Sequence, residues 1–93
     1  MKELSKICIK MNFIEMIIKI MRKFLDDPKI SFWSFKLLFI FLKFNQEKNI
    51  IQKMNNILRK EDFENAKKKN KKSQKIIEKF LNLFEYLKKN QEK

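Results

Sequence analysis

The chain has 93 residues, which is enough for one domain with a modest core and too few for two. Its formal net charge is +12, and it contains no glycine and no histidine. Acid–base catalysis near neutral pH usually depends on histidine, and phosphate loops depend on glycine. We therefore expect a protein that is not an enzyme, with no cofactor, no metal site and no small-molecule substrate.

Lysine carries almost all of the positive charge, because Arg22 and Arg59 are the two arginines among 23 basic residues. We attribute part of this bias, and the abundance of Ile, Asn and Phe, to an AT-rich genome. The charge still attracts RNA, other polyanions and anionic membrane surfaces. Since lysine lacks the planar fork with which arginine reads guanine edges, we expect attraction to a nucleic-acid backbone rather than base-specific reading.

The single cysteine, Cys8, has no partner for a disulfide, which favours a reducing compartment. We interpret its side chain as part of the core, since no histidine is present to activate it. Glu3 and nearby lysines interrupt the N-terminal apolar residues, so we expect no cleavable secretory signal. The prediction is an intracellular protein, either in an organelle such as a mitochondrion or plastid or in the cytoplasm.

Helix is the expected structure along the whole chain, because good helix formers abound and hairpin turn residues are missing. Pro28 is the one strong breaker, and Asp27 before it is a suitable N-terminal cap. The sequence thus predicts an all-α fold, a small bundle of three to four amphipathic helices within a single domain, 1–93. Their approximate limits are 3–26, 28–44, 46–60 and 62–91.

The first predicted helix is apolar around most of its circumference. One stripe recurs at intervals of three and four residues, which places its members on one helical face. It consists of Ile7, Met11, Ile14, Ile18, Met21 and Leu25. Further apolar residues, among them Ile9, Ile17, Ile20 and Phe24, widen the stripe beyond half of the helix surface. Such a helix needs apolar neighbours on more than one side.

Residues 30–44 hold eleven apolar residues and two lysines, which raises the question of a membrane span. Fifteen helical residues cover roughly 22 Å, whereas a hydrocarbon core is about 30 Å thick. Lys36 also lies near the middle of the segment. We therefore interpret this helix as buried in a core or lying at an interface, rather than as a span.

The third helix shows a single apolar stripe, and the last one shows its stripe in its C-terminal half. The sequence leaves open whether the second and third helices are continuous, because residues 45–49 lack a strong breaker. Asp62 is the predicted cap of the last helix. The third-helix stripe comprises Ile50, Ile51, Met54, Ile57 and Leu58, and the last-helix stripe comprises Ile76, Ile77, Phe80, Leu83, Phe84 and Leu87.

A basic segment at 66–73 interrupts these patterns, and it is either a solvated turn of the last helix or a mobile joint. Clustered lysines release counterions from a polyanion, so the segment is also a candidate binding site. An ordinary solvated helix face in a lysine-rich chain is the alternative. The candidate polyanion-binding residues are Lys67, Lys68, Lys69, Lys71, Lys72 and Lys75.

The first two helices together carry more apolar surface than two slimmer helices of a small bundle can cover. Exposed apolar patches of several hundred Å² usually mark interfaces, so we expect a partner there. Core packing, base stacking and a membrane interface are competing interpretations for the aromatic residues near Trp33. The candidate interface residues are Phe32, Trp33, Phe35, Phe39, Ile17 and Phe24.

The leading hypothesis is a non-enzymatic, basic helical subunit of a larger assembly, such as a ribonucleoprotein of an organellar ribosome. Apolar helix faces would dock on a protein while lysines face RNA. The alternative is a membrane-associated accessory subunit, for instance of a respiratory complex, that uses residues 30–44 as an interfacial or short membrane helix. Self-association through the surplus apolar faces is a third hypothesis.

Overall fold

The structure, a computed structural model, describes the backbone of residues 2–91 and the side chains of residues 9–90. Every regular element in this part of the chain is helical, as the predicted fold class requires. Cys8, predicted to line the core, lies outside the described side chains. The elements are α1 (Lys2–Lys23), α2 (Pro28–Phe44), α3 (Lys48–Ile57), α4 (Lys60–Lys69), a 3₁₀ turn η1 (Lys71–Ser73) and α5 (Gln74–Gln91).

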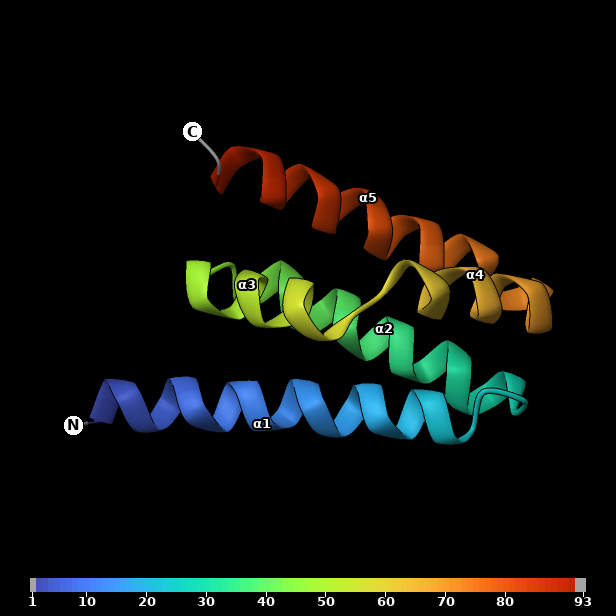
Figure 1. The fold of residues 1–93 in the computed structure, drawn as a ribbon, viewed down its shortest axis with the longest axis horizontal. Coiled ribbons are helices and arrows are strands. Elements are labelled where there is room, and N and C mark those ends of the chain that lie inside the picture. The colour runs from blue at the N-terminus through green and yellow to red at the C-terminus, as the bar shows by residue number, and fades with distance from the viewer. Residues whose placement is uncertain (1, 92–93) are drawn as a thin grey trace.

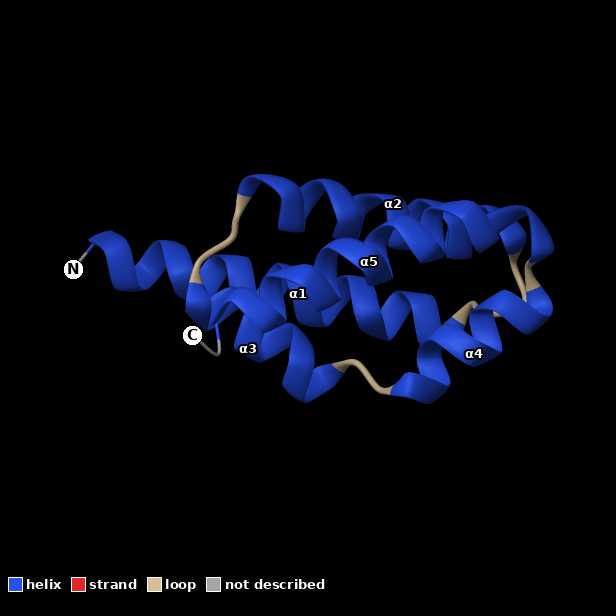
Figure 2. Ribbon diagram, turned by 90° about the horizontal axis from the view of Figure 1, so that it is seen from above, coloured by secondary structure: helices blue, strands red, loops and turns tan. Residues whose placement is uncertain are grey.

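These elements form a compact bundle of 41 × 27 × 19 Å in which α3 and α4 follow one another along one side (Figure 1). α1 and α5 lie on opposite sides of the bundle, and α2 lies across from α3 and α4 (Figure 2). α2 therefore packs against both α1 and α5, and α3 packs against the same two helices from the other side. The chain thus passes along the bundle as α1, then α2, then α3 with α4 as the third pass, and finally α5 (Figure 1).

The structure divides the described chain into five α-helices, which corrects the predicted count of three to four. The difference arises in the predicted helix 62–91, which breaks at Asn70. Asn70 is buried, and its side-chain amide donates a hydrogen bond of 3.0 Å to the carbonyl oxygen of Leu25. This contact holds the backbone out of helical geometry, with φ −130° and ψ 81°. α4 ends and α5 starts around it.

The other helix boundaries combine predicted and unpredicted features. Asp27 caps α2, since its carboxylate accepts hydrogen bonds from the backbone N–H groups of Lys29 and Ile30 at 2.9 and 3.2 Å. α2 and α3 are separate helices. Asp62 is not the cap of α4. It lies in the first turn, where its carboxylate accepts from the backbone N–H of Arg59, the residue at the cap position.

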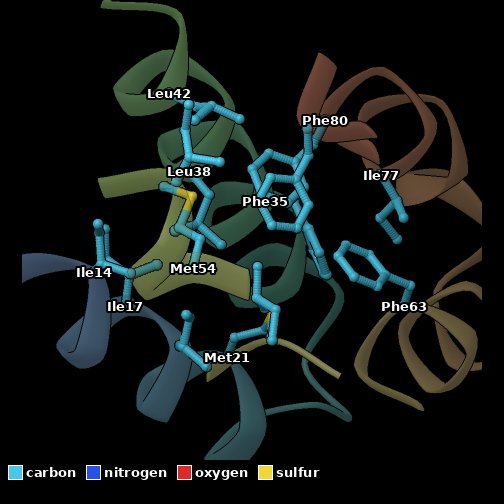
Figure 3. Packing of buried hydrophobic residues seen from close by; sticks show 14 of the residues in the cluster. Ile14, Ile17, Met21, Phe35, Leu38, Leu42, Met54, Phe63, Ile77 and Phe80 are labelled. Carbon is cyan, nitrogen blue, oxygen red and sulfur yellow. The ribbon is translucent and has the colours of Figure 1, made fainter. Parts of the chain in front are cut away.

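The core lies where α2, α5, α4 and the inner faces of α1 and α3 meet (Figure 3). Phe35, Phe63 and Phe80 come from three different helices, and their ring centroids lie 6.0 to 6.2 Å apart. Such offset and edge contacts between aromatic rings are favourable beyond the burial of their area. The predicted stripes of α3 and α5 supply half of the remaining buried apolar residues, including Ile50, Met54, Ile77 and Phe84.

Ion pairs fasten α1 to the third pass of the chain. Lys10 pairs with Glu47, Glu15 with Lys53, and Arg22 with Asp62, each at 2.7 Å. These pairs direct the charged side of α1 toward α3 and α4. Among the helices that the structure describes, none has both the length and the apolar character needed to cross a membrane.

Candidate binding surfaces

The outer sides of α1 and α2 expose large apolar side chains that the closed bundle does not cover. Their exposed fractions range from 40% at Ile20 to 76% at Phe44. On each helix they recur at intervals of three, four or seven residues and so form one stripe. We call the two stripes together the apolar face, which consists of Ile9, Met16 and Ile20 of α1, Phe24 directly after α1, and Trp33, Leu37, Ile40 and Phe44 of α2.

The two stripes lie side by side along the seam between α1 and α2. These helices pack against each other, and the rings of Phe13 and Phe41 stack across the seam with centroids 5.3 Å apart. At about 100° per residue, Phe13 is next to the exposed stripe of α1, and Phe41 is next to that of α2. The apolar face is therefore one surface that spans two antiparallel helices.

Lysines border the apolar face. α2 contains no acidic residue, and its charged residues are Lys29, Lys36 and Lys43. On α1, Lys19 and Lys23 lie next to the exposed stripe on the helical wheel, whereas Glu15 points to α3, where it pairs with Lys53. The Lys23 ammonium lies 5.6 Å from the ring centroid of Phe24. The border of this surface is thus basic along α1 and α2, and Asp26 and Asp27 lie beside Phe24 at the turn between them.

The predicted interface residues divide into three groups in the structure. Trp33 and Phe24 belong to the apolar face, and Phe32 and Phe39 are half-buried beside it. The prediction was wrong for Phe35 and Ile17, because these side chains are 0% and 4% exposed and form part of the core. Both sides of α2 are apolar, so spacing alone did not distinguish the side that meets α5 from the side that stays exposed.

Several members of the apolar face were missing from the predicted interface: Ile9, Met16, Ile20, Leu37, Ile40 and Phe44. A signal for them was present, since 33, 37, 40 and 44 recur as one helical stripe. The sequence offered a second stripe on the same helix, at 31, 34, 35, 38 and 42, and only the packing shows that this second one is buried.

The six lysines predicted to bind a polyanion gather at one end of the bundle. Lys67, Lys68 and Lys69 lie in the last turn of α4, Lys71 and Lys72 in η1, and Lys75 in the first turn of α5. Lys67 is half-buried and the other five are exposed. We call this group the basic end. It lies beside the turn between α1 and α2 (Figure 2).

Acidic side chains offset part of this charge, and Glu64 lies near Lys67 and Lys68. Lys69 pairs with Asp26 at 2.7 Å, and the Asp26 side chain is 87% exposed. The α1–α2 turn brings Lys23 and Lys29 near the same end together with Asp26 and Asp27, so the turn adds lysines but no net charge. A polyanion at the basic end would therefore meet lysines from three parts of the chain.

A cleft of about 430 Å³ lies where the apolar face meets the basic end. It is lined by Pro28, Lys29, Phe32, Trp33, Lys72 and Ser73. The rings of Phe32 and Trp33 meet edge to face at 5.7 Å, and the Lys36 ammonium lies 4.9 Å from the centroid of Trp33. The hydroxyl oxygen of Ser73 is buried and has no hydrogen-bond partner among the described residues. Sequence reasoning did not predict this cleft, because η1 did not exist in the predicted fold.

No three of the His, Cys, Asp and Glu side chains that the structure describes come close enough together to hold a metal ion. The polar groups at the cleft are lysine ammonium groups and a serine hydroxyl. Comparison of the chain with protein-family models, with curated proteins and with solved structures finds no match.

Proposed function

We propose that this protein is a non-enzymatic binding subunit of a larger assembly, most simply a ribonucleoprotein such as an organellar ribosome. The apolar face docks on a partner protein, and the basic end faces RNA. The observation that carries the proposal is the exposure of eight large apolar side chains after the bundle has closed its own core. Contiguous apolar surfaces of this kind mark interaction sites in folded proteins.

The basic border of the apolar face favours a different protein over a second copy of this chain. Two copies that met through this face would bring Lys19, Lys23, Lys36 and Lys43 against one another, on molecules that each carry +12. Like charges that face each other across an interface oppose association, whereas an acidic border on the partner would favour it. The expected protein partner therefore has apolar residues surrounded by Asp and Glu.

The polyanion proposal rests on the position of the lysines as well as on their number. The basic end brings together side chains from α4, η1 and α5 at one end of the bundle, where a nucleic-acid backbone meets several ammonium groups at once. Each phosphate contact of this type releases counterions and makes binding sensitive to salt. Lysines are suited to this task without reading base edges.

Salt dependence of RNA binding tests this part of the proposal. We expect single-stranded RNA to bind with a steep decrease in affinity as salt rises, with a slope near −0.7 for each phosphate contact. The double variant Lys68→Gln with Lys71→Gln should bind more weakly and lower the magnitude of the slope by about 1.4. The matched control is Lys43→Gln with Lys48→Gln, which removes the same charge from the opposite end. If both pairs weaken binding equally, the basic end is not the site.

A membrane-associated accessory subunit is the second candidate, and the lysine border with Trp33 favours it. Interfacial helices commonly carry lysines beside an apolar surface that contains Trp, Phe and Leu. Sedimentation with vesicles that contain anionic lipid separates the two functions. Retention on vesicles at high salt, with detergent needed for release, would support the membrane function. A protein that stays in solution at high salt and binds RNA at low salt would support the ribonucleoprotein function.

A further inference from the structure

We propose that the cleft at Trp33 binds an unpaired base of single-stranded nucleic acid, with the adjoining phosphates on Lys29 and Lys72. The inference rests on the proposed function, and it adds the form of nucleic acid and the place where a base is held. It is carried by two observations: an exposed aromatic wall, and lysines on both sides of the cleft.

The aromatic wall is suited to stacking. Trp33 is 55% exposed although it lies beside the half-buried Phe32, and both rings line the cleft. A nucleobase gains free energy by stacking on such a ring, largely irrespective of its identity. Bases in a duplex are already stacked on each other, so an exposed tryptophan selects bases that are unpaired.

Lysine ammonium groups border the cleft, and we expect them to contact the phosphates next to a stacked base. Lys29 belongs to the first turn of α2, and Lys72 belongs to η1, so the two ammonium groups come from separate segments that border one cleft. Lys36 adds a third ammonium group close to the rings, 4.9 Å from the centroid of Trp33 and 5.8 Å from that of Phe32. Lysine ammonium groups act as mobile point charges, which suits a flexible single strand.

The break at Asn70 creates this cleft. Because the Asn70 side chain is bound to the carbonyl of Leu25, the chain turns into η1 beside the start of α2. This turn brings Lys72 and Ser73 to Trp33, about forty residues away in the sequence. A continuous helix through 62–91 would not turn in this way. The site thus depends on the same contact that separates α4 from α5.

Fluorescence offers a direct test, because Trp33 is the single tryptophan of the chain. The intact protein is titrated with a uridine oligonucleotide, with an abasic ribose-phosphate strand of the same length, and with a blunt duplex. Fluorescence anisotropy of a dye on each strand shows when it is bound. We expect quenching of Trp33 by the uridine oligonucleotide and little or none by the other two at equal saturation. Equal quenching by all three, or none by any of them when bound, overturns the proposal.

Two matched variants locate the effect. Trp33→Leu should weaken uridine oligonucleotide binding roughly fivefold to a hundredfold, the range for losing one stacked base. Phe44→Leu is the control, since it removes an exposed ring from the other end of the same helix. Lys72→Gln should weaken binding more than Lys48→Gln. Circular dichroism checks that each variant is folded. Equal affinity of Trp33→Leu and wild type overturns the cleft as the binding site.

The outcomes also separate this inference from the proposed function. Suppose that the strands bind with a steep salt slope while Trp33 is not quenched and Trp33→Leu leaves the affinity unchanged. In that case the cleft proposal fails and RNA binding by the basic end remains. If no nucleic acid binds, both fail. Vesicles of anionic lipid that shift the emission of Trp33 to the blue, when the oligonucleotide does not quench it, would assign the cleft to a membrane surface and overturn the proposal.

Discussion

The two adjacent aspartates at the α1–α2 turn have different roles. Asp27 accepts hydrogen bonds from two backbone N–H groups at the start of α2, whereas Asp26 makes an ion pair with Lys69 at the surface. The free N–H groups of a first helical turn need hydrogen-bond acceptors, whereas an exposed ion pair contributes little to the stability of the fold. Both residues are acidic and neighbouring, so they provide a matched test of the cap.

Asp27→Ala is expected to lower the free energy of unfolding by about 1 kcal/mol, because two N–H groups lose their acceptor. Asp26→Ala removes the same charge from the same turn and should cost less. Urea unfolding followed by circular dichroism measures both. An equal loss for the two variants would show that charge, rather than capping, accounts for the contribution of Asp27.

Asp62 is the most strongly engaged acidic residue that the structure describes. Its carboxylate accepts from the Arg22 guanidinium through two nitrogens, at 2.9 and 2.7 Å, and from the backbone N–H of Arg59 at 2.9 Å. Burial alone would raise the pKa of Asp62, but the hydrogen bonds from Arg22 and Arg59 and the charge of Arg22 outweigh it, so the pKa is lowered. Arg22 also donates to the carbonyl of Ile57 and so links α1 to the α3–α4 junction.

Asp62→Asn should therefore lower the free energy of unfolding at pH 7 by about 1 to 2 kcal/mol. Because the pKa is lower in the folded state, the ionised pair stabilises the fold above the usual Asp range, near pH 4. This contribution disappears as the pH falls through the lowered pKa, and the wild type and variant should then converge. Urea unfolding between pH 7 and pH 2 measures this difference.

Glu15→Gln serves as the control, since it breaks the exposed pair with Lys53 and should change stability less than Asp62→Asn does. A stability difference between wild type and Asp62→Asn that stayed constant down to pH 2 would contradict the assigned role of the ionised carboxylate.

Among the elements, α5 contributes most clearly to the core. Ile77, Phe80, Phe84 and Leu87 are buried along one stripe, and Tyr86 on the other side is 62% exposed. Phe80 contacts the rings of Phe35, Phe63 and Phe84. This stripe was predictable from spacing alone, because the polar residues between its members leave one apolar side.

Phe80→Ala is expected to lower the free energy of unfolding by about 3 to 5 kcal/mol, through lost burial and the cavity that remains. Tyr86→Ala, on the same helix, should stay within about 0.5 kcal/mol of wild type. Thermal or urea unfolding distinguishes them. Similar losses in both variants would mean that α5 does not pack through the stripe that contains Phe80.

Two features of the elements were beyond sequence reasoning. The segment KKKNKK contains no strong helix breaker, and its break depends on the hydrogen bond between Asn70 and Leu25, 45 residues apart. α2 is apolar on both sides, so burial of Phe35 and exposure of Trp33 depend on where α5 packs. Capping at Asp27 and the α3 and α5 stripes were predictable because local chemistry or one-sided polarity decides them.

At the scale of the whole molecule, the fold places its two kinds of surface next to each other. The apolar face follows the α1–α2 seam, and the basic end lies at the turns that join α4 to α5 and α1 to α2. A bundle of this size buries only part of the surface that its chain exposes when unfolded, and here the uncovered part includes the eight large side chains of the apolar face. The proposed partner protein would cover this part without changing the core.

The most direct test of this account compares Leu37→Gln with Leu38→Gln by urea unfolding. Leu37 is 43% exposed on the apolar face and its neighbour Leu38 is 0% exposed in the core, although both are leucines in the middle of α2. We expect Leu37→Gln to remain within about 1 kcal/mol of wild type and Leu38→Gln to lose about 3 kcal/mol or more. An equal, large loss for both would mean that the isolated chain buries its apolar face, which would remove the basis for a docking partner.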